Sequence, residues 1–145
     1  MYLVTGGAGF IGSNLVKYLC NKGEKVVVCD YKSSFNNNNY IQKKDIFDLI
    51  EPNSLIDFLE KKNKFKAIIH LGANSSTTET NGDLIWKQNI LSSMKIWNWC
   101  LKNNTRLIYA SSAATYGQGE HGFLDNDTID YLNSLKPLNL YGWTK

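Results

Sequence analysis

Residues 2–12, with the sequence YLVTGGAGFIG, constrain the fold more than any other stretch of the chain. A short apolar run suited to a strand meets a glycine cluster and then a helical pattern with apolar residues Ile11, Leu15, Val16 and Leu19. Gly7, Gly9 and Gly12 fit the spacing G-x-G-x-x-G, and Gly6, Gly9 and Gly12 also fit G-x-x-G-x-x-G. Such glycines permit a tight turn and let a pyrophosphate approach the backbone, while the helix N-terminus attracts its charge. The alternative is a flexible loop, but the flanking strand and helix favour a dinucleotide-binding turn.

The composition argues against several other classes of protein. Hydrophobic residues make up 43% of the 145 and charged residues 20%, which is ordinary for a globular domain. No apolar stretch approaches the length of a membrane span, and no basic and apolar leader precedes the first strand. We therefore expect a cytoplasmic protein with no membrane partner. The net charge of +3 is mild and the lysines are scattered, so we expect no nucleic-acid partner.

Cysteine and histidine residues give no sign of a metal site. Cys20, Cys29 and Cys100 are odd in number, widely spaced and set among apolar residues, which suits reduced core thiols. His70 lies in a strand-like run and His121 in a glycine-rich loop. We expect a satisfied strand histidine and a surface histidine, and no metal cofactor.

The second strand is expected at Lys25–Asp30, an apolar run that suits a buried parallel sheet. Asp30, its last residue, follows Gly12 by eighteen positions, close to the spacing at which a carboxylate binds the adenosine ribose hydroxyls. The alternative for Asp30 is a loop cap. Residues 31–39 are polar and rich in asparagine, so we expect a loop over the adenosine end.

The remaining chain alternates between helical and strand-like patterns. Asp45 and Ile46 follow a short mixed segment, and a helix with Leu55, Ile56, Phe58 and Leu59 then ends at the lysine-rich residues 61–64. Later elements are a strand at Ala67–Leu71 with a turn at Gly72–Ser75, a long helix from about Asp83 to Lys102, and a fifth strand-like run at Arg106–Ala110 before Ser111 and Ser112. This alternation predicts an α/β fold with a doubly wound parallel sheet, the Rossmann fold, as one dinucleotide-binding domain over residues 1–145. Ligands of such sheets lie beyond the carboxyl ends of the strands.

The long helix carries a wide apolar stripe, which we interpret as core rather than as a cofactor site. Its members are Leu84, Ile85, Ile90, Leu91, Met94, Trp97 and Leu101.

Tyr141 and Lys145 form the pair with the clearest chemical meaning. On a helix, residues four apart lie on one face, so the lysine ammonium can sit beside the phenol. A cation there favours the phenolate, which makes tyrosine a usable base. Ser112 could hydrogen-bond the substrate oxygen and hold it toward Tyr141. The spacing Y-x-x-x-K alone is common, but with the glycine turn and Asp30 it favours catalysis over a chance surface pair.

At these residues the chain resembles the extended short-chain dehydrogenase/reductase family. Three runs carry the closest likeness: GANSSTTE at 72–79, YASSAATYG at 109–117 and KPLNLYG at 136–142. They are similar to the branch of the family whose members epimerise an ADP-activated heptose for the lipopolysaccharide core. The likeness spans the chain but is loose over residues 31–63 and 118–134.

The resemblance implies a role for each matching residue. Ser112 would orient the substrate, Tyr141 would act as acid and base, and Lys145 would bind the nicotinamide ribose and favour the phenolate. Candidate cofactor contacts are Gly6, Gly9, Phe10, Ile11, Gly12, Asp30, Tyr31, Asp45, Ile46, Leu71, Gly72, Ala73, Asn74, Ser75, Gln88, Asn89, Tyr141 and Lys145, and candidate substrate contacts are Ser75, Ser112 and Tyr141.

The implied reaction is inversion at C6 of the heptose through a 6-keto intermediate, with a tightly bound NADP or NAD. Family members often carry lysines after the acidic residue that can meet a 2′-phosphate, whereas here only Lys32 is close, so either nucleotide is open. Family members are also roughly twice as long. We therefore expect an N-terminal fragment, with the sheet incomplete and the substrate domain absent, that is inactive alone and homo-oligomeric when full length.

Two other functions stay open. One is a different nucleotide-sugar 4-epimerase or 4,6-dehydratase, although a dehydratase usually has an acidic residue just after the serine, where this chain has Ala113 and Ala114. The other is a non-catalytic dinucleotide-binding module, against which the presence of Ser112, Tyr141 and Lys145 counts.

Overall fold

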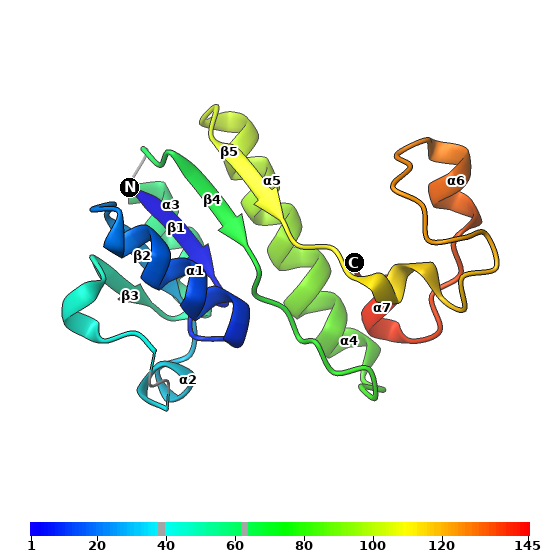
Figure 1. The fold of residues 1–145 in the computed structure, drawn as a ribbon, viewed down its shortest axis with the longest axis horizontal. Coiled ribbons are helices and arrows are strands. Elements are labelled where there is room, and N and C mark those ends of the chain that lie inside the picture. The colour runs from blue at the N-terminus through cyan, green and yellow to red at the C-terminus, as the bar shows by residue number, and fades with distance from the viewer. Residues whose placement is uncertain (38–39, 62–63) are drawn as a thin grey trace. The chain divides into compact units, whose positions relative to one another are not determined.

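A parallel five-stranded sheet forms the centre of the structure, a computed structural model that describes residues 1–37, 40–61 and 64–145. Its strand order is β3-β2-β1-β4-β5 (Figure 1). The strands are β1 (Tyr2–Thr5), β2 (Val26–Cys29), β3 (Asp48–Ile50), β4 (Ala67–His70) and β5 (Arg106–Tyr109). Leu3 pairs with Val27 on one side and with Ile68 on the other, which fixes the register around the central strand.

Helices cover both faces of this sheet, as the sequence analysis predicts for a doubly wound fold (Figure 1). The helices of the described residues are α1 (Phe10–Asn21), α2 (Lys32–Asn36), α3 (Leu55–Lys61), α4 (Gly82–Ile85), α5 (Ser92–Lys102), α6 (Ile129–Ser134) and α7 (Leu140–Trp143), and those that cover the sheet are α1, α2, α3 and α5. A π-helical segment, η3 (Trp86–Leu91), joins α4 to α5, and short 3-10 turns are η1 (Lys43–Asp45), η2 (Pro52–Ser54) and η4 (Ala113–Tyr116).

The core has two halves because successive strand residues point to opposite faces. On one face, Leu3, Val27 and Ile68 pack with α3 and α5. On the other, Val4, Val28 and Ile69 pack with α1 and α2. The connection from β1 to β2 therefore runs over one face and that from β4 to β5 over the other, which is what right-handed crossovers in opposite directions from the central strand require.

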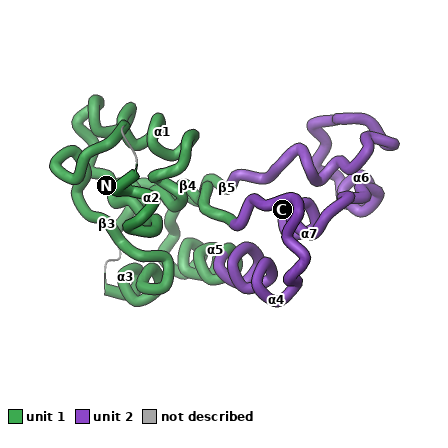
Figure 2. The backbone as a smooth tube through the Cα atoms, turned by 90° about the horizontal axis from the view of Figure 1, so that it is seen from below, with its two compact units in different colours: residues 1–73, 93–109 green, residues 74–92, 110–145 purple. Residues whose placement is uncertain are grey.

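The chain divides into two compact units, coloured separately in Figure 2. Unit 1 comprises residues 1–73 and 93–109 and contains the sheet with α1, α2 and α3. Unit 2 comprises residues 74–92 and 110–145 and contains α4, η3, η4, α6 and α7.

The expected loop at 31–39 is wrong over Lys32–Asn36, which form α2. Phe35 explains the difference, because its side chain is buried in the half-core of Val4 and Val28. One buried aromatic residue can anchor a helical turn that its polar neighbours would not predict. Residues 38 and 39 of the expected loop lie outside the described residues, as do 62 and 63 of the lysine-rich segment.

The apolar stripe of the long helix is exposed over most of its length, so its assignment to the core is wrong. Exposed members are Leu84, Leu91, Met94, Trp97 and Leu101, whereas Ile85 is buried. The residues of α5 that face the sheet are instead Ile96, Trp99 and Cys100. Trp99 also donates through Nε1 to the carbonyl of Leu59, 3.1 Å away, which ties α5 to α3.

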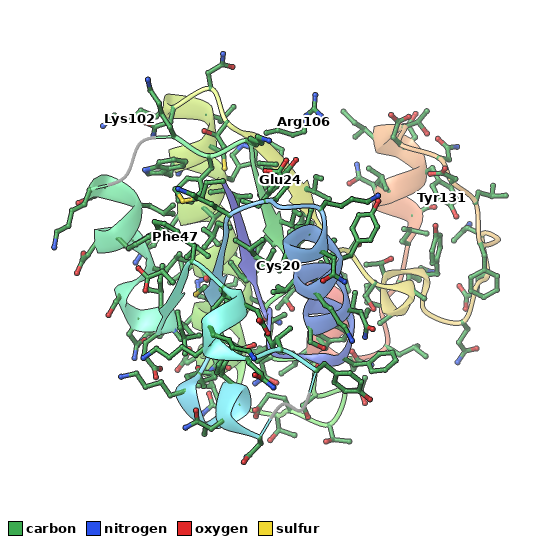
Figure 3. All side chains as sticks on the ribbon, turned by 60° about the vertical axis from the view of Figure 1, so that its left-hand side comes forward. Cys20, Glu24, Phe47, Lys102, Arg106 and Tyr131 are labelled. Atoms are coloured by element: carbon green, nitrogen blue, oxygen red, sulfur yellow. The ribbon has the colours of Figure 1, made fainter. Side chains whose placement is uncertain are left out.

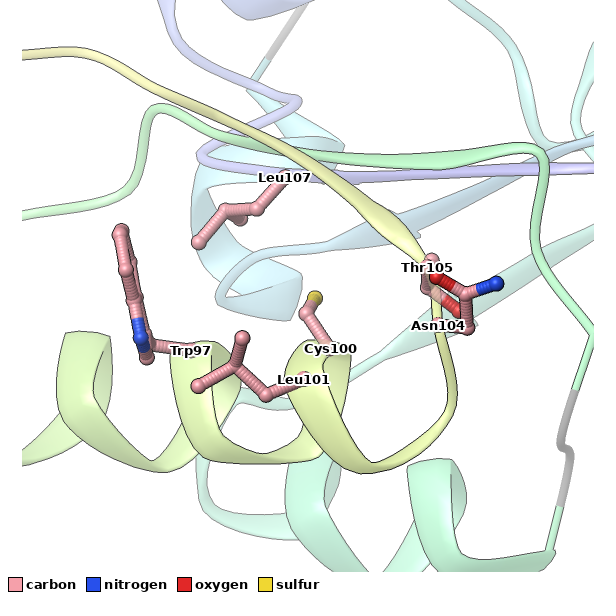
Figure 4. A pocket seen from close by; sticks show the side chains of 6 residues that line it. All are labelled: Trp97, Cys100, Leu101, Asn104, Thr105 and Leu107. Carbon is pink, nitrogen blue, oxygen red and sulfur yellow. The ribbon is translucent and has the colours of Figure 1, made fainter.

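Part of that exposed stripe borders a hollow of unit 1. Figure 4 shows Trp97 and Leu101 on α5 together with Leu107 of the edge strand β5 and the neighbouring Cys100. The helix therefore has two apolar faces, and periodicity cannot tell which of them meets the sheet.

Strand ends also differ slightly from the predicted ones. β2 ends at Cys29, so Asp30 follows the strand rather than ending it. β4 and β5 end at His70 and Tyr109. β3, just after Ile46, lies in a segment to which the sequence analysis assigns no strand.

All three cysteines are free thiols. Cys29 and Cys100 are buried, and Cys20 lies half-buried on α1 (Figure 3). Burial, followed by the charges of Asp30 and Glu51, raises the pKa of Cys29 to about 12, so this thiol stays protonated at neutral pH. Among the residues that the structure describes, no helix is long and apolar enough to cross a membrane.

Candidate functional site

The glycine turn of unit 1 runs from the end of β1 to the start of α1. Gly6 has a positive φ of 65° and donates its N–H to the carbonyl of Cys29 at 2.9 Å. A methyl group on Gly6 would lie 2.8 Å from the backbone of Gly72, and one on Gly12 would run into the carbonyl oxygen of Gly6. Glycine is therefore required at both positions, for backbone conformation at Gly6 and for close packing at both.

The N-terminus of α1 has the properties of a phosphate site. Within the described residues, no side chain caps this helix and no acidic residue stands in its first turn. Phe10 and Ile11 are largely exposed, so the first turn is accessible. Uncapped amides and the positive end of a twelve-residue helix suit a pyrophosphate, and the backbone cradle that Gly6 and Gly12 form fits the dinucleotide predicted for it.

Asp30 links the end of β2 to the glycine turn. Its Oδ2 accepts from the N–H of Ala8 at 2.9 Å, and its Oδ1 accepts from the N–H of Tyr31 at 2.8 Å. The carboxylate is therefore held next to the turn by two backbone amides. Each carboxylate oxygen has a second lone pair, so this arrangement is compatible with the predicted ribose contact as well as with the loop-cap alternative.

The other cofactor candidates of unit 1 lie after neighbouring strands or on a turn. Asp45 is exposed at the end of η1, while Ile46 is buried in the half-core of α1 and α2. Leu71, Gly72 and Ala73 follow β4 directly. Because β1, β2 and β4 are parallel neighbours, the structure brings the glycine turn, Asp30 and residues 71–73 to one edge of the sheet.

His70 is a buried strand histidine, as predicted, with polar partners on both sides. Its Nδ1 lies 2.6 Å from Thr5 Oγ1, and its Nε2 lies 2.9 Å from Ser93 Oγ. Thr5 Oγ1 also accepts from the N–H of Gly72 at 3.0 Å. His121 is exposed, as predicted. In the described part of the chain, no three His, Cys, Asp or Glu residues gather where they could hold a metal ion.

In unit 2, Ser112 begins the turn η4. Its Oγ accepts from the N–H of Ala114 at 3.1 Å, which orients the hydroxyl. That bond uses an oxygen lone pair and leaves the hydroxyl proton to donate. Ser112 is half-buried, whereas Ser111 is exposed.

Tyr141 lies in α7, and Lys145 follows the residue that ends this helix. Asn139 caps the helix through its Oδ1, which accepts from the N–H of Gly142 at 2.8 Å. The N–H of Lys145 donates to the carbonyl of Gly142 at 3.2 Å, so the last turn continues to the lysine. Burial lowers the pKa of the Lys145 ammonium, because desolvation disfavours its charged form.

Gly142 is a packing position of the candidate site that the sequence analysis does not identify. A methyl group there would lie 2.7 Å from the carbonyl oxygen of Ala114 and 2.8 Å from Cβ of Pro137. The glycine thus lets α7, with Tyr141, pack against the turn that Ser112 begins. A glycine directly after the tyrosine is the only local signal for this contact.

The remaining candidates of unit 2 lie on two segments. Asn74 and Asn89 are hydrogen-bonded to each other, since the N–H of Asn74 donates to Asn89 Oδ1 at 2.7 Å. Ser75 is exposed and Gln88 is half-buried. Unit 2 therefore brings Asn74 and Asn89 together, and packs the turn that Ser112 begins against the helix of Tyr141.

The sheet order and the glycine turn define a dinucleotide-binding α/β fold of the Rossmann type. A comparison with protein families matches residues 2–145 to the NAD dependent epimerase/dehydratase family, and the chain belongs to that family.

Two curated relatives of the chain share one name. The chain is 40% identical over 149 residues to a protein of Fusobacterium nucleatum named ADP-L-glycero-D-manno-heptose-6-epimerase. A protein of Brachyspira hyodysenteriae with the same name is 42% identical over 152 residues. Both alignments take in the whole of this chain but only 45% and 46% of the relatives, so the chain spans less than half of their length.

Solved structures give a similar result. The Helicobacter pylori ADP-L-glycero-D-manno-heptose-6-epimerase matches 99% of this chain and 47% of its own, with a TM-score of 0.73 and 28% identity. The Brucella ovis UDP-glucose 4-epimerase in complex with NAD matches 99% of this chain and 43% of its own, with a TM-score of 0.68 and 28% identity.

Proposed function

We propose that the protein carrying this chain is a nucleotide-sugar epimerase. Its substrate would be ADP-glycero-manno-heptose, inverted at C6 through a transient 6-keto intermediate, in heptose synthesis for the lipopolysaccharide core. The single observation that carries the proposal is the packing of α7, with Tyr141, against the turn of Ser112, which the absence of a side chain on Gly142 permits. Whole-chain identity of about 40% to proteins named for that reaction supports the substrate.

Several of the predicted contacts would hold the dinucleotide. The first turn of α1 would bind the pyrophosphate, Asp30 and Tyr31 would bind the adenosine ribose, and Lys145 would bind the nicotinamide ribose. When bound, the nicotinamide accepts hydride from carbon and returns it. The family and the NAD-bound relative favour NAD. NADP is the alternative, because family members that resemble this chain often carry lysines after the acidic residue that can meet a 2′-phosphate.

The protein residues would supply orientation and proton transfer. Ser112 would donate its hydroxyl proton in a hydrogen bond to the substrate oxygen on C6. Tyr141, as the phenolate, would take the proton of that hydroxyl as the C–H bond breaks and the carbonyl forms. After the keto sugar rotates in the site, Tyr141 would return the proton to the oxygen as hydride adds to the opposite face. Lys145, four residues after Tyr141, would place a positive charge near the phenolate.

Two features weigh against the alternatives. Ala113 and Ala114 follow Ser112, where a dehydratase would carry an acid for elimination of water. The presence of Ser112, Tyr141 and Lys145 together counts against a non-catalytic module.

The substitution Tyr141→Phe in the full-length protein tests the proposal. This change removes one oxygen and keeps the ring, so epimerisation of ADP-heptose should be lost while NAD affinity stays within about twofold. Tyr18→Phe is the matched control, since Tyr18 is an exposed tyrosine of α1 far along the chain from the predicted pair. A Tyr141→Phe enzyme that epimerises within tenfold of the wild type would refute the assignment.

A further inference from the structure

The π-helical segment η3 carries a fully buried amide that faces protein groups of unit 2. Asn89 is 1% exposed. Its Oδ1 accepts from the N–H of Asn74 at 2.7 Å, and its Nδ2 donates to the carbonyl of Asn74 at 3.0 Å and to Thr144 Oγ1 at 2.8 Å. Both amide protons of Asn89 are therefore used within the protein. A π-helical turn is costly relative to an α-helix and often marks a functional position.

Thr144 stands between the two members of the predicted pair, one residue before Lys145 and three after Tyr141. It is 8% exposed, although it is polar and ends a short helix. Its Oγ1 donates to the carbonyl of Tyr141 at 2.8 Å and accepts the bond from Asn89. The hydroxyl thus joins the last turn of α7 to the buried amide.

The helix α7 needs such an anchor because it is only four residues long. A helix of this length does not hold its conformation by its own backbone bonds. In the described residues its fixed points are the Asn139 cap at one end, the contact of Gly142 with Ala114 in the middle, and the bond from Thr144 to Asn89 at the other end. The last of these lies next to Lys145.

We propose that Thr144 is a positioning residue for the Tyr141 and Lys145 pair, with Asn89 as its buried anchor. This inference rests on the proposed function. Because Asn89 also holds both backbone groups of Asn74, one side chain fixes a segment predicted to contact the cofactor and the segment predicted to carry the proton. The assignment gives Asn89 a role different from the direct cofactor contact expected from the resemblance.

The test compares Thr144→Val with Thr144→Ser in the gene-encoded protein. Valine keeps the shape and removes the hydroxyl, which leaves the buried Asn89 donor without its Thr144 partner, whereas serine keeps both bonds. We expect Thr144→Val to lower kcat for epimerisation by about ten- to a hundredfold, since small displacements of reacting groups have effects of this size. KM should stay within about twofold, and the loss of NAD affinity should be much smaller than the loss of kcat because Lys145 is one of several predicted cofactor contacts. On the acid side of the pH–activity profile, the activity of Thr144→Val should begin to fall at a higher pH than that of the wild type. Thr144→Ser should restore kcat to within about threefold.

Amide hydrogen exchange gives a readout that needs no turnover. The N–H of Thr144 and that of Lys145 donate within the last turn of α7, and both should exchange faster in Thr144→Val than in Thr144→Ser. Equal exchange in the two variants would overturn the anchor, as would equal kcat, or a loss of kcat matched by an equal loss of NAD affinity. If the wild type epimerises no nucleotide-sugar, the proposed function fails, and the exchange rates still decide whether Thr144 anchors the turn.

Discussion

Replacing Gly12 with alanine should weaken dinucleotide binding more than the same replacement at any other glycine of the turn. The added Cβ would meet the carbonyl oxygen of Gly6, with Cα of Gly7 at 2.8 Å and the carbonyl carbon of Gly6 at 2.9 Å. All three neighbours are backbone atoms, so no side chain can rotate to make room. Either the turn keeps its form at a cost of about 1–3 kcal/mol in folding, or it shifts and the amides leave the phosphate.

We expect the turn to shift, because the first turn of α1 is exposed and can move. The same 1–3 kcal/mol then appears as about a 5- to 150-fold rise in the Kd for NAD. Isothermal titration measures the binding, and urea unfolding measures the stability of each variant. Gly82→Ala serves as the control, since a methyl group on Gly82 meets nothing within 4 Å and its φ is not positive.

The control should bind NAD like the wild type and should be neutral or slightly more stable. A Gly12→Ala protein that keeps its Kd within twofold and its stability within about 0.5 kcal/mol would show that the turn tolerates a side chain. That result would remove the packing argument for a pyrophosphate cradle.

Three further outcomes follow from single contacts. Asp30→Ala should weaken NAD more than NADP, because the carboxylate binds ribose hydroxyls and repels a 2′-phosphate; titration with both nucleotides checks this, and equal losses would remove Asp30 from the ribose. Gly142→Ala should lower epimerisation at least tenfold with NAD affinity kept, because its methyl group would separate α7 from Ala114; unchanged turnover would refute that packing role. The N–H of Asn81 and the amide of Asn74 hold the pKa of Glu79 below its usual range, so stability from this carboxylate is present above about pH 4.5 and is lost as the pH falls through the lowered pKa; urea unfolding from about pH 3 to 6 should show a smaller acid loss in Glu79→Gln.

Local patterns predict the sheet and its glycine turn because their causes are local. An apolar run such as Val26–Cys29 is buried on both faces in a parallel sheet, and the glycine spacing marks a tight turn that glycine permits. The same reasoning predicts the alternation of strands and helices from which the parallel sheet follows.

Predictions fail where the partner of a residue lies far along the chain. Trp97 and Trp99 are both apolar residues of α5, yet Trp97 is exposed and Trp99 is buried against α3. Their different burial follows from which face of α5 meets the sheet and α3. Likewise, the helical turn around Phe35 forms because this side chain packs in the half-core that contains Val4 and Val28.

Asn89 shows the same limit at the candidate site. A motif can indicate that this asparagine matters, but its side-chain amide hydrogen-bonds Asn74 and Thr144, which lie 15 and 55 positions away. Such a role follows from the fold and not from the spacing of residues in one segment.

Polar side chains that are buried in this structure hold backbone segments by hydrogen bonds. The buried polar residues of the described chain are Thr5, Ser13, His70, Asn89 and Thr144, and among the described atoms no buried side-chain nitrogen or oxygen lacks a hydrogen-bond partner. An unpaired group would cost about 1–3 kcal/mol, so each of these residues restricts its neighbours to positions that satisfy it. In unit 1, Thr5 Oγ1 accepts from the N–H of Gly72 and lies 2.6 Å from His70 Nδ1, and His70 Nε2 lies 2.9 Å from Ser93 Oγ. That chain of bonds fixes the backbone after β4 against the end of β1, where the glycine turn begins, as the Asn89 amide fixes Asn74 and Thr144 in unit 2.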